Sequence, residues 1–321
     1  MGYSFRHDDD SVETGFRRIA AEQLTKALAS LDDDGALHAG VHDARKRIKK
    51  LRGLMRLVRP GFRAYPSENA KLRDAARTLS GLRDHTAMLE TLERLSARYP
   101  DRIDRRRTVP LRRALEARRD EAVAAPDLSD RIDAFRCVLR GARERAEGWR
   151  LKAEGWEALG PGLALTYGRG RSAMAEAHRT GRGEDYHEFR KRVKYHGYHA
   201  RLLAPVWPPL MAPYAALLDD LGESLGEQHD LVAFAPIVAG SELATEARIG
   251  LEDLIAEERL ALEARALVVG ARVFAEKPRA MARRMGAWWV AWAADPGAVD
   301  QDDAKDPPSA ASISAMLSSI P

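Results

Sequence analysis

The chain has 321 residues, of which 45% are hydrophobic and 31% are charged, with a formal net charge of +4. This is the composition of a globular protein with enough residues for one large core or two smaller ones. Absence of a long uncharged apolar run argues against a membrane span, and the single cysteine, Cys137, excludes an intramolecular disulfide. The N-terminus has no secretory pattern, so we expect a cytoplasmic protein.

Nearly every segment has the pattern of an amphipathic helix, because Ala, Leu, Arg and Glu dominate and runs of Val, Ile or Thr are absent. The first helix is expected to begin at Ser11, a residue type common at helix N-caps. The expected helices are 11–31, 38–59, 66–97, 109–123, 130–148, 156–179, 184–204, 209–238, 243–269 and 277–294. The sequence therefore predicts an all-α protein.

The C-terminal end has a different composition. Residues 295–321 are rich in Asp, Pro and Ser, which predicts a flexible tail. Three tryptophans, Trp288, Trp289 and Trp292, precede it on the last expected helix. We expect them to pack on the neighbouring helices, with contact to a partner as the alternative.

One motif occurs twice. HDARKRIKKLRGLMRLVRPGF begins at His42, and HEFRKRVKYHGYHARLLAPVW begins at His187, 145 residues later. The matched pairs are His42/His187, Arg45/Arg190, Lys46/Lys191, Arg47/Arg192, Lys49/Lys194, Arg56/Arg201 and Leu57/Leu202. The duplication predicts two pseudo-symmetric helical bundles, residues 8–150 and 155–294, around a shared basic groove.

A second pair of segments follows the motifs. LSGLRDHTAML (79–89) and LGEQHDLVAF (225–234) align Asp84 with Asp230. We expect these two aspartates to hold an Arg or His of the basic motif in place. A catalytic carboxylate is the alternative, but no second acid stands at a recognisable spacing.

Each motif forms two adjacent stripes when it is placed on a helix. The apolar stripes are Val41, Ala44, Ile48, Leu51, Met55 and Val58, and Tyr186, Phe189, Val193, His196, Ala200 and Leu203. The basic stripes are His42, Arg45, Lys46, Lys49, Arg52 and Arg56, and His187, Arg190, Lys191, Lys194 and Arg201. Gly197 replaces the cation that corresponds to Arg52, which weakens the second stripe.

Charges of one sign at i,i+4 repel and weaken a helix. A solvated charged face is one interpretation of either stripe alone. Because the pattern recurs, we favour a polyanion that neutralises both stripes. His42 and His187 are either helix-start residues or phosphate donors that are partly protonated once an anion raises their pKa. A metal site is not expected, since the neighbouring cations repel a metal ion.

Other features bear on the ligand. YGRGRSAM (167–174) adds Arg169 and Arg171 as weaker candidates. Single-strand nucleic-acid binders interleave aromatic residues with basic ones, and the motifs offer only Tyr195 and Tyr198, so nucleic acid is not the expected partner. We find no P-loop, GxGxxG, HExxH, CxxC or GxSxG motif, and expect no cofactor.

The duplicated pattern, HDARKRIK and HEFRKRVK, resembles the CHAD domain, the conserved histidine α-helical domain. GFRRIAAEQL, YGRGRSAMAEA, LLAPVWPPL and LGEQHDL are similar to other stretches of that family, so that the resemblance spans about residues 8–290. It implies two helical bundles with a basic groove between them. It also implies that inorganic polyphosphate binds in this groove through the Lys, Arg and His side chains of the two basic stripes.

The resemblance further implies a non-enzymatic protein at cytoplasmic polyphosphate granules, with granule surface proteins as possible partners. Two alternatives stay open at this point. One is an enzyme of polyphosphate or nucleotide metabolism, which needs carboxylates to hold a metal ion. The other is a nucleic-acid-binding protein or a granule scaffold.

Overall fold

The computed structural model describes residues 2–32, 37–79 and 81–295, and in these ranges it contains eleven α-helices, one short 3-10 helix and no strand. The all-α prediction is confirmed. The helices are α1 (Val12–Ala29), α2 (Leu37–Leu57), α3 (Tyr65–Arg77), α4 (Gly81–Arg98), α5 (Val109–Val123), α6 (Leu128–Ala146), α7 (Gly155–Thr180), α8 (Gly183–Leu202), α9 (Pro208–Ala239), α10 (Thr245–Val273) and α11 (Pro278–Ala293), with the 3-10 helix at Ala204–Val206. The predicted tail from residue 296 onward lies outside the described residues.

The helix predicted over residues 66–97 is two helices, α3 and α4. Their break exposes backbone carbonyl groups, and arginines from elsewhere in the chain bind them. Arg131 donates to the carbonyl oxygen of Thr78 at 3.3 Å, and Arg45 donates to that of Leu79 at 2.7 Å. Gly81, a residue that weakens helix interiors, begins α4, and the two distant arginines stabilise the break.

A large apolar core joins both halves of the chain. It contains side chains from α1, α2, α3 and α6 together with side chains from α7, α8, α9 and α11. Both predicted apolar stripes lie in it or at its edge, since every member of each stripe is buried. Gly162 of α7 lies so close to α2 that an added Cβ would stand 1.7 Å from the carbonyl oxygen of Leu57.

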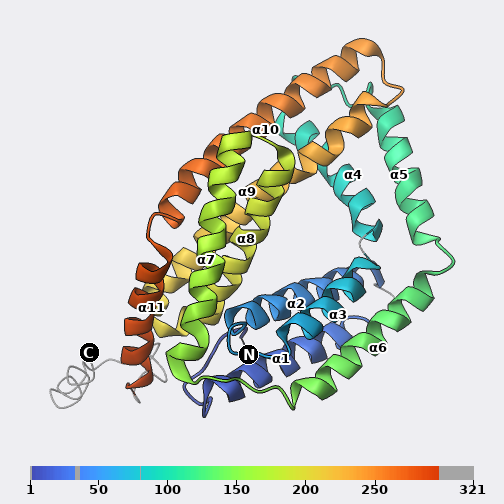
Figure 1. Ribbon diagram of the computed structural model, residues 1–321. Coiled ribbons are helices and arrows are strands. Elements are labelled where there is room, and N and C mark those ends of the chain that lie inside the picture. Colours follow the sequence, from blue (N-terminus) through green and yellow to red (C-terminus); the bar gives the residue numbers. More distant parts are fainter. Residues whose placement is uncertain (1, 33–36, 80, 296–321) are drawn as a thin grey trace, which may run out of the picture.

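A second apolar cluster contains side chains of α4 and α5 together with side chains of α9 and α10. Figure 1 shows these helices at one end of the molecule. Leu92 and Leu115 meet Phe234 and Leu254 there. Helices from residues 81–123 therefore pack on the second half of the chain rather than on α1 and α2. The division into bundles 8–150 and 155–294 stays a prediction; its boundary falls in the connection between α6 and α7.

Ion pairs surround this second cluster. Arg102 lies 2.6 Å from Glu257, and Arg107 lies 2.8 Å from Glu246. These pairs are exposed and each contributes little to stability, so the apolar contacts are the main attachment. No helix within the described ranges has the length and apolar character needed to cross a bilayer.

Candidate anion-binding surface

The two motif helices, α2 and α8, cross in direct contact. Gly53 of α2 faces the ring of Tyr198, and an added Cβ at this glycine would lie 2.8 Å from Cδ2 of the tyrosine. Nε2 of the buried His199 lies 3.0 Å from the carbonyl oxygen of Gly53. The crossing therefore buries Gly53, Tyr198 and His199, and cations lie on both sides of it.

On one side of the crossing lie four arginines, Arg52, Arg56, Arg59 and Arg169, which we call the arginine cluster. The guanidinium carbon of Arg56 lies 3.9 Å from the centre of the Tyr195 ring, and its Nη1 donates to the carbonyl oxygen of Arg52 at 2.8 Å. Nε of Arg52 donates to Oδ1 of Asn69 at 3.0 Å. These partners are neutral, so they position the arginines without cancelling their charge.

The cluster is electrostatically crowded. Burial lowers the pKa of Arg169, and the nearby positive charges of Arg59 and Arg192 lower it further. Burial also lowers the pKa of Arg52, with Arg56 contributing. Among the described residues, none of the four cluster arginines forms a salt bridge with a carboxylate. An anion that bound here would relieve this repulsion.

On the other side of the crossing, Lys46, Lys50 and Arg201 line an open cavity of about 460 Å³, which we call the lysine pocket. The hydroxyl of Tyr3, which also lines it, donates to the carbonyl oxygen of Lys50 at 2.6 Å. Burial lowers the pKa of Lys50 to about 8, and the charges of Arg47, Arg201 and Lys46 add to this effect. The lysine pocket thus has the charge and the room for a phosphate group.

The second basic stripe lies along α9, and glycines of α9 leave space for it. The side chain of Lys194 crosses Gly222, and that of Arg190 crosses Gly226. Acids neutralise part of this stripe: Nζ of Lys194 lies 2.6 Å from Glu223, and Arg201 pairs with Asp219. Lys191 pairs with Glu188.

Gly197, the departure noted in the second motif, packs against Leu218 of α9. A long basic side chain in its place would enter the contact between α8 and α9. An added Cβ at Gly197 would stand at ordinary contact distance, 3.6 Å, from Leu218, so a steric clash at Cβ does not explain the missing cation. Together with the acids of α9, it makes the second stripe less positive than the first.

The two histidines that begin the motifs differ in environment. His42 is exposed on α2. His187 is half-buried and its ring lies 4.1 Å from that of His229. Burial lowers the pKa of His187 to about 4, and the neighbouring His229 and Lys191 lower it further, so the ring is neutral near pH 7 before any anion binds.

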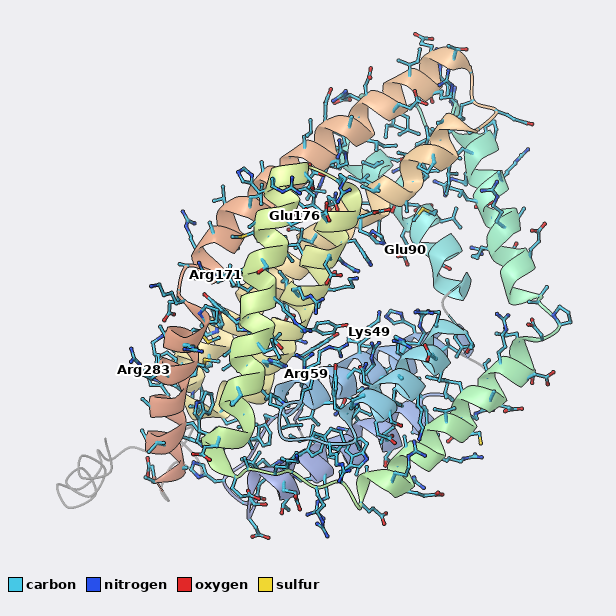
Figure 2. The ribbon with its side chains drawn as sticks, viewed as in Figure 1. Lys49, Arg59, Glu90, Arg171, Glu176 and Arg283 are labelled. Atoms are coloured by element: carbon cyan, nitrogen blue, oxygen red, sulfur yellow. The ribbon has the colours of Figure 1, made fainter. Side chains whose placement is uncertain are left out.

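Lys46 lines the lysine pocket, and the remaining predicted residues are dispersed. Lys46 and Lys49 are exposed on α2, while Arg45 is half-buried and binds the carbonyl oxygen of Leu79. Arg171 lies on the side of α7 that faces α11, where it donates to the carbonyl oxygen of Glu276, away from Lys49 and Arg59 (Figure 2). It therefore does not join the arginine cluster.

The two aspartates complete the predicted set. Asp230 is half-buried on α9. Asp84 stands in the first turn of α4, and its side chain lies outside those that the structure describes. Their supporting role stays a prediction.

Sequence reasoning missed Lys50 and Arg59. Both belong to the first motif, but Lys50 is off the basic stripe and Arg59 follows the end of α2 at Leu57, where helical spacing no longer applies. Their positions depend on contacts with Arg201 and Arg169 that are far away in sequence. In the described parts of the chain, no group of three or more His, Cys, Asp or Glu side chains is arranged to hold a metal ion.

Comparison with known proteins identifies the family. The CHAD domain matches residues 18–239, more than two thirds of the chain, and its range ends at the last residue of α9. PptA from Streptomyces chartreusis has a similar fold, with a TM-score of 0.59 and 15% sequence identity over 81% of this chain and 98% of that protein. No curated protein matches the sequence. The chain belongs to the CHAD domain family.

Proposed function

We propose that this protein binds inorganic polyphosphate on the arginine cluster and the lysine pocket, without hydrolysing it, at polyphosphate granules in the cytoplasm. The CHAD domain family is associated with polyphosphate binding. The observation that carries the proposal for this chain is the arginine cluster, in which Arg52 and Arg56 have neutral partners while Arg59 and Arg56 crowd Arg169. Guanidinium groups bind phosphate oxygens strongly and with defined geometry.

Polyphosphate fits this surface better than a nucleic acid does. A base needs an exposed aromatic face on which to stack. Tyr198 is buried in the helix crossing, and Arg56 covers one face of Tyr195. The two aromatic residues of the second motif therefore serve packing and the positioning of Arg56. A polyanion without bases can bind the arginines and has no bases that need an aromatic surface.

The proposal includes an internal duplication with a groove along the crossing. Gly53 and Tyr198, which contact each other, are separated by the 145 residues that relate the two motifs. A twofold axis brings equivalent positions together in this way. One polyphosphate chain that follows the groove would contact the arginine cluster and the lysine pocket in turn.

The test is a titration of the pure protein with long-chain polyphosphate and with single-stranded RNA of equal total charge, at several salt concentrations. We expect polyphosphate to bind more tightly, with an affinity that falls steeply as salt rises, because binding releases counterions. RNA binding of equal or greater strength would contradict the proposal.

The absence of hydrolysis is tested separately. Phosphoryl transfer needs a positioned nucleophile and, in most enzymes, a metal ion held by carboxylates. We expect polyphosphate incubated with the protein and magnesium or manganese to release no phosphate above a denatured control. If the protein releases phosphate and the variant Asp230→Asn does not, the protein has an enzymatic function instead.

A further inference from the structure

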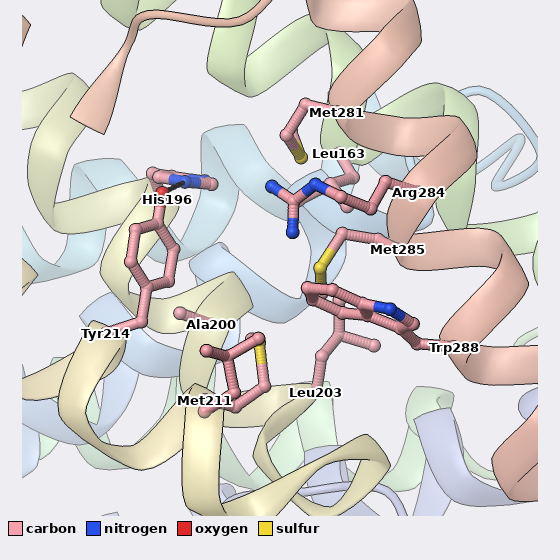
Figure 3. A pocket seen from close by; sticks show the side chains of 11 residues that line it. Leu163, His196, Ala200, Leu203, Met211, Tyr214, Met281, Arg284, Met285 and Trp288 are labelled. Carbon is pink, nitrogen blue, oxygen red and sulfur yellow. Dashed lines mark hydrogen bonds between the residues drawn. The ribbon is translucent and has the colours of Figure 1, made fainter. Parts of the chain in front are cut away.

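A separate cavity of about 150 Å³ lies between α8, α9 and α11, with α7 at its side. Its walls are mainly apolar and rich in methionine, with Met211, Met281 and Met285 around it and the indole of Trp288 along one edge (Figure 3). Methionine side chains adapt readily to the shape of an apolar guest. An engineered cavity of this volume accommodates benzene, so the space suits a body of about six carbon atoms.

One cation enters this apolar space. The guanidinium group of Arg284 points into the cavity, and its central carbon lies 4.5 Å from the ring centre of Trp288. Glu276 binds one edge of the group through Nη2 and, at 3.4 Å, Nε. Nη1 makes no hydrogen bond within the described residues, so it can donate to a guest.

The other polar groups of the cavity are neutral. Nε2 of His196 lies 2.7 Å from the hydroxyl of Tyr214, and both side chains line the cavity. Burial lowers the pKa of His196 to about 4 and raises the pKa of Tyr214, so neither is charged near pH 7. Arg284 is thus the one charged residue among those that line the cavity, which matches a guest with a single negative charge.

We propose that this cavity binds a small monocarboxylate with an apolar body of about four to six carbon atoms, whose carboxylate meets Nη1 of Arg284 and whose hydrocarbon lies among the methionines. An arginine binds a carboxylate with charge-assisted hydrogen bonds, and these are stronger in an apolar surrounding. Polyphosphate does not fit, because its charged chain would lose its hydration against the apolar walls. The site is therefore distinct from the arginine cluster and the lysine pocket.

Calorimetric titration with hexanoate and with hexan-1-ol tests the assignment. We expect hexanoate to bind at least about tenfold more tightly than the alcohol, because only the carboxylate forms charge-assisted hydrogen bonds. Saturating polyphosphate should leave hexanoate binding unchanged. No hexanoate binding, equal binding of the alcohol, or competition by polyphosphate would each overturn the proposal.

Three variants locate the guest. Arg284→Met should weaken hexanoate binding about tenfold, while Arg283→Met, an exposed neighbour on the same helix, should leave it unchanged. Glu276→Gln removes the carboxylate that competes for Arg284 and should strengthen binding. Because the first and third variants act in opposite directions, general damage to the fold cannot produce both results. Equal affinity in all variants would contradict the role of Arg284.

Discussion

Tyr198 packs against the backbone of Gly53, and this contact joins the two helices that carry the basic motifs. Lys50 and Arg56 stand three residues before and after Gly53, while Tyr195 and Arg201 stand three residues before and after Tyr198. Arg56 lies on Tyr195, and Lys50 shares a cavity with Arg201. The crossing therefore separates the arginine cluster from the lysine pocket and fixes the position of each.

Replacement of Gly53 by valine should destabilise the fold. The new side chain would collide with the ring of Tyr198, which lies 2.8 Å from the added Cβ, and overpacking of this kind costs about 1–3 kcal/mol. Gly250→Val is the matched control, since Gly250 is also helical but has no atom within 4 Å of an added Cβ. Urea denaturation measures both. Equal stability of the two variants would show that the helices do not pack closely at Gly53.

Polyphosphate binding should weaken as the pH rises from about 7 to 9. The pKa of Lys50 is about 8 in the free protein, and a bound anion raises it by favouring the charged form. Above about pH 8 the free protein must take up a proton in order to bind, so affinity falls by up to about tenfold per pH unit.

The matched variant for this pH effect is Lys50→Arg, which keeps its charge throughout the range. Titrations with long-chain polyphosphate at pH 7, 8 and 9 should show a flat profile for this variant. An equally steep profile in the variant and the original protein would assign the effect to another group.

Removal of an acid beside the lysine pocket should strengthen binding. Asp219 pairs with Arg201, so Asp219→Asn frees that guanidinium group for a phosphate. We expect affinity to rise about two- to fivefold, the range of an exposed ion pair. Asp220→Asn, which makes the same change in net charge at the exposed next residue, is the control. An equal gain in both variants would mean that only overall charge matters.

Acid should unfold the protein through two buried histidines. Burial lowers the pKa of His196 to about 4 and that of His199 to about 3, whereas both have a pKa of about 6.5 when unfolded. The unfolded chain therefore binds more protons below pH 6.5, and the stability present above that pH is lost as pH falls toward 3. His199→Gln should reduce the slope of unfolding free energy against pH, and exposed His178→Gln should not.

The local features of the site were predictable from the sequence. Spacing at three and four residues placed Val41 and Ile48 in the core and Lys49 beside it, because helical periodicity depends on neighbours in the chain. The two motifs were also recognisable, and the family they indicated is confirmed.

The long-range features were not predictable. Arg131 and Arg45 bind carbonyl groups at the break between α3 and α4, and these contacts could not be predicted, although Gly81 marks the break locally. Asp219 lies 18 residues from Arg201, and their pairing depends on how α9 packs on α8. Gly197 indicated a weaker second stripe, but the acids of α9 that pair with Lys194 and Arg201 were not predictable, because charge balance across helices follows from tertiary packing.

The central claim is that the arginine cluster holds the polyphosphate chain, and a charge-reversal titration tests it most directly. The double variant Arg59→Glu, Arg169→Glu changes two cluster residues, and Arg279→Glu, Arg283→Glu makes the same charge change on the exposed side of α11. We predict that the cluster variant loses about tenfold or more in polyphosphate affinity. The slope of its log affinity against log salt should fall in magnitude by about 2 units, one for each lost phosphate contact, while the slope of the α11 variant stays the same. Equal losses of affinity and slope in both variants, with circular dichroism showing that both are folded, would contradict the claim.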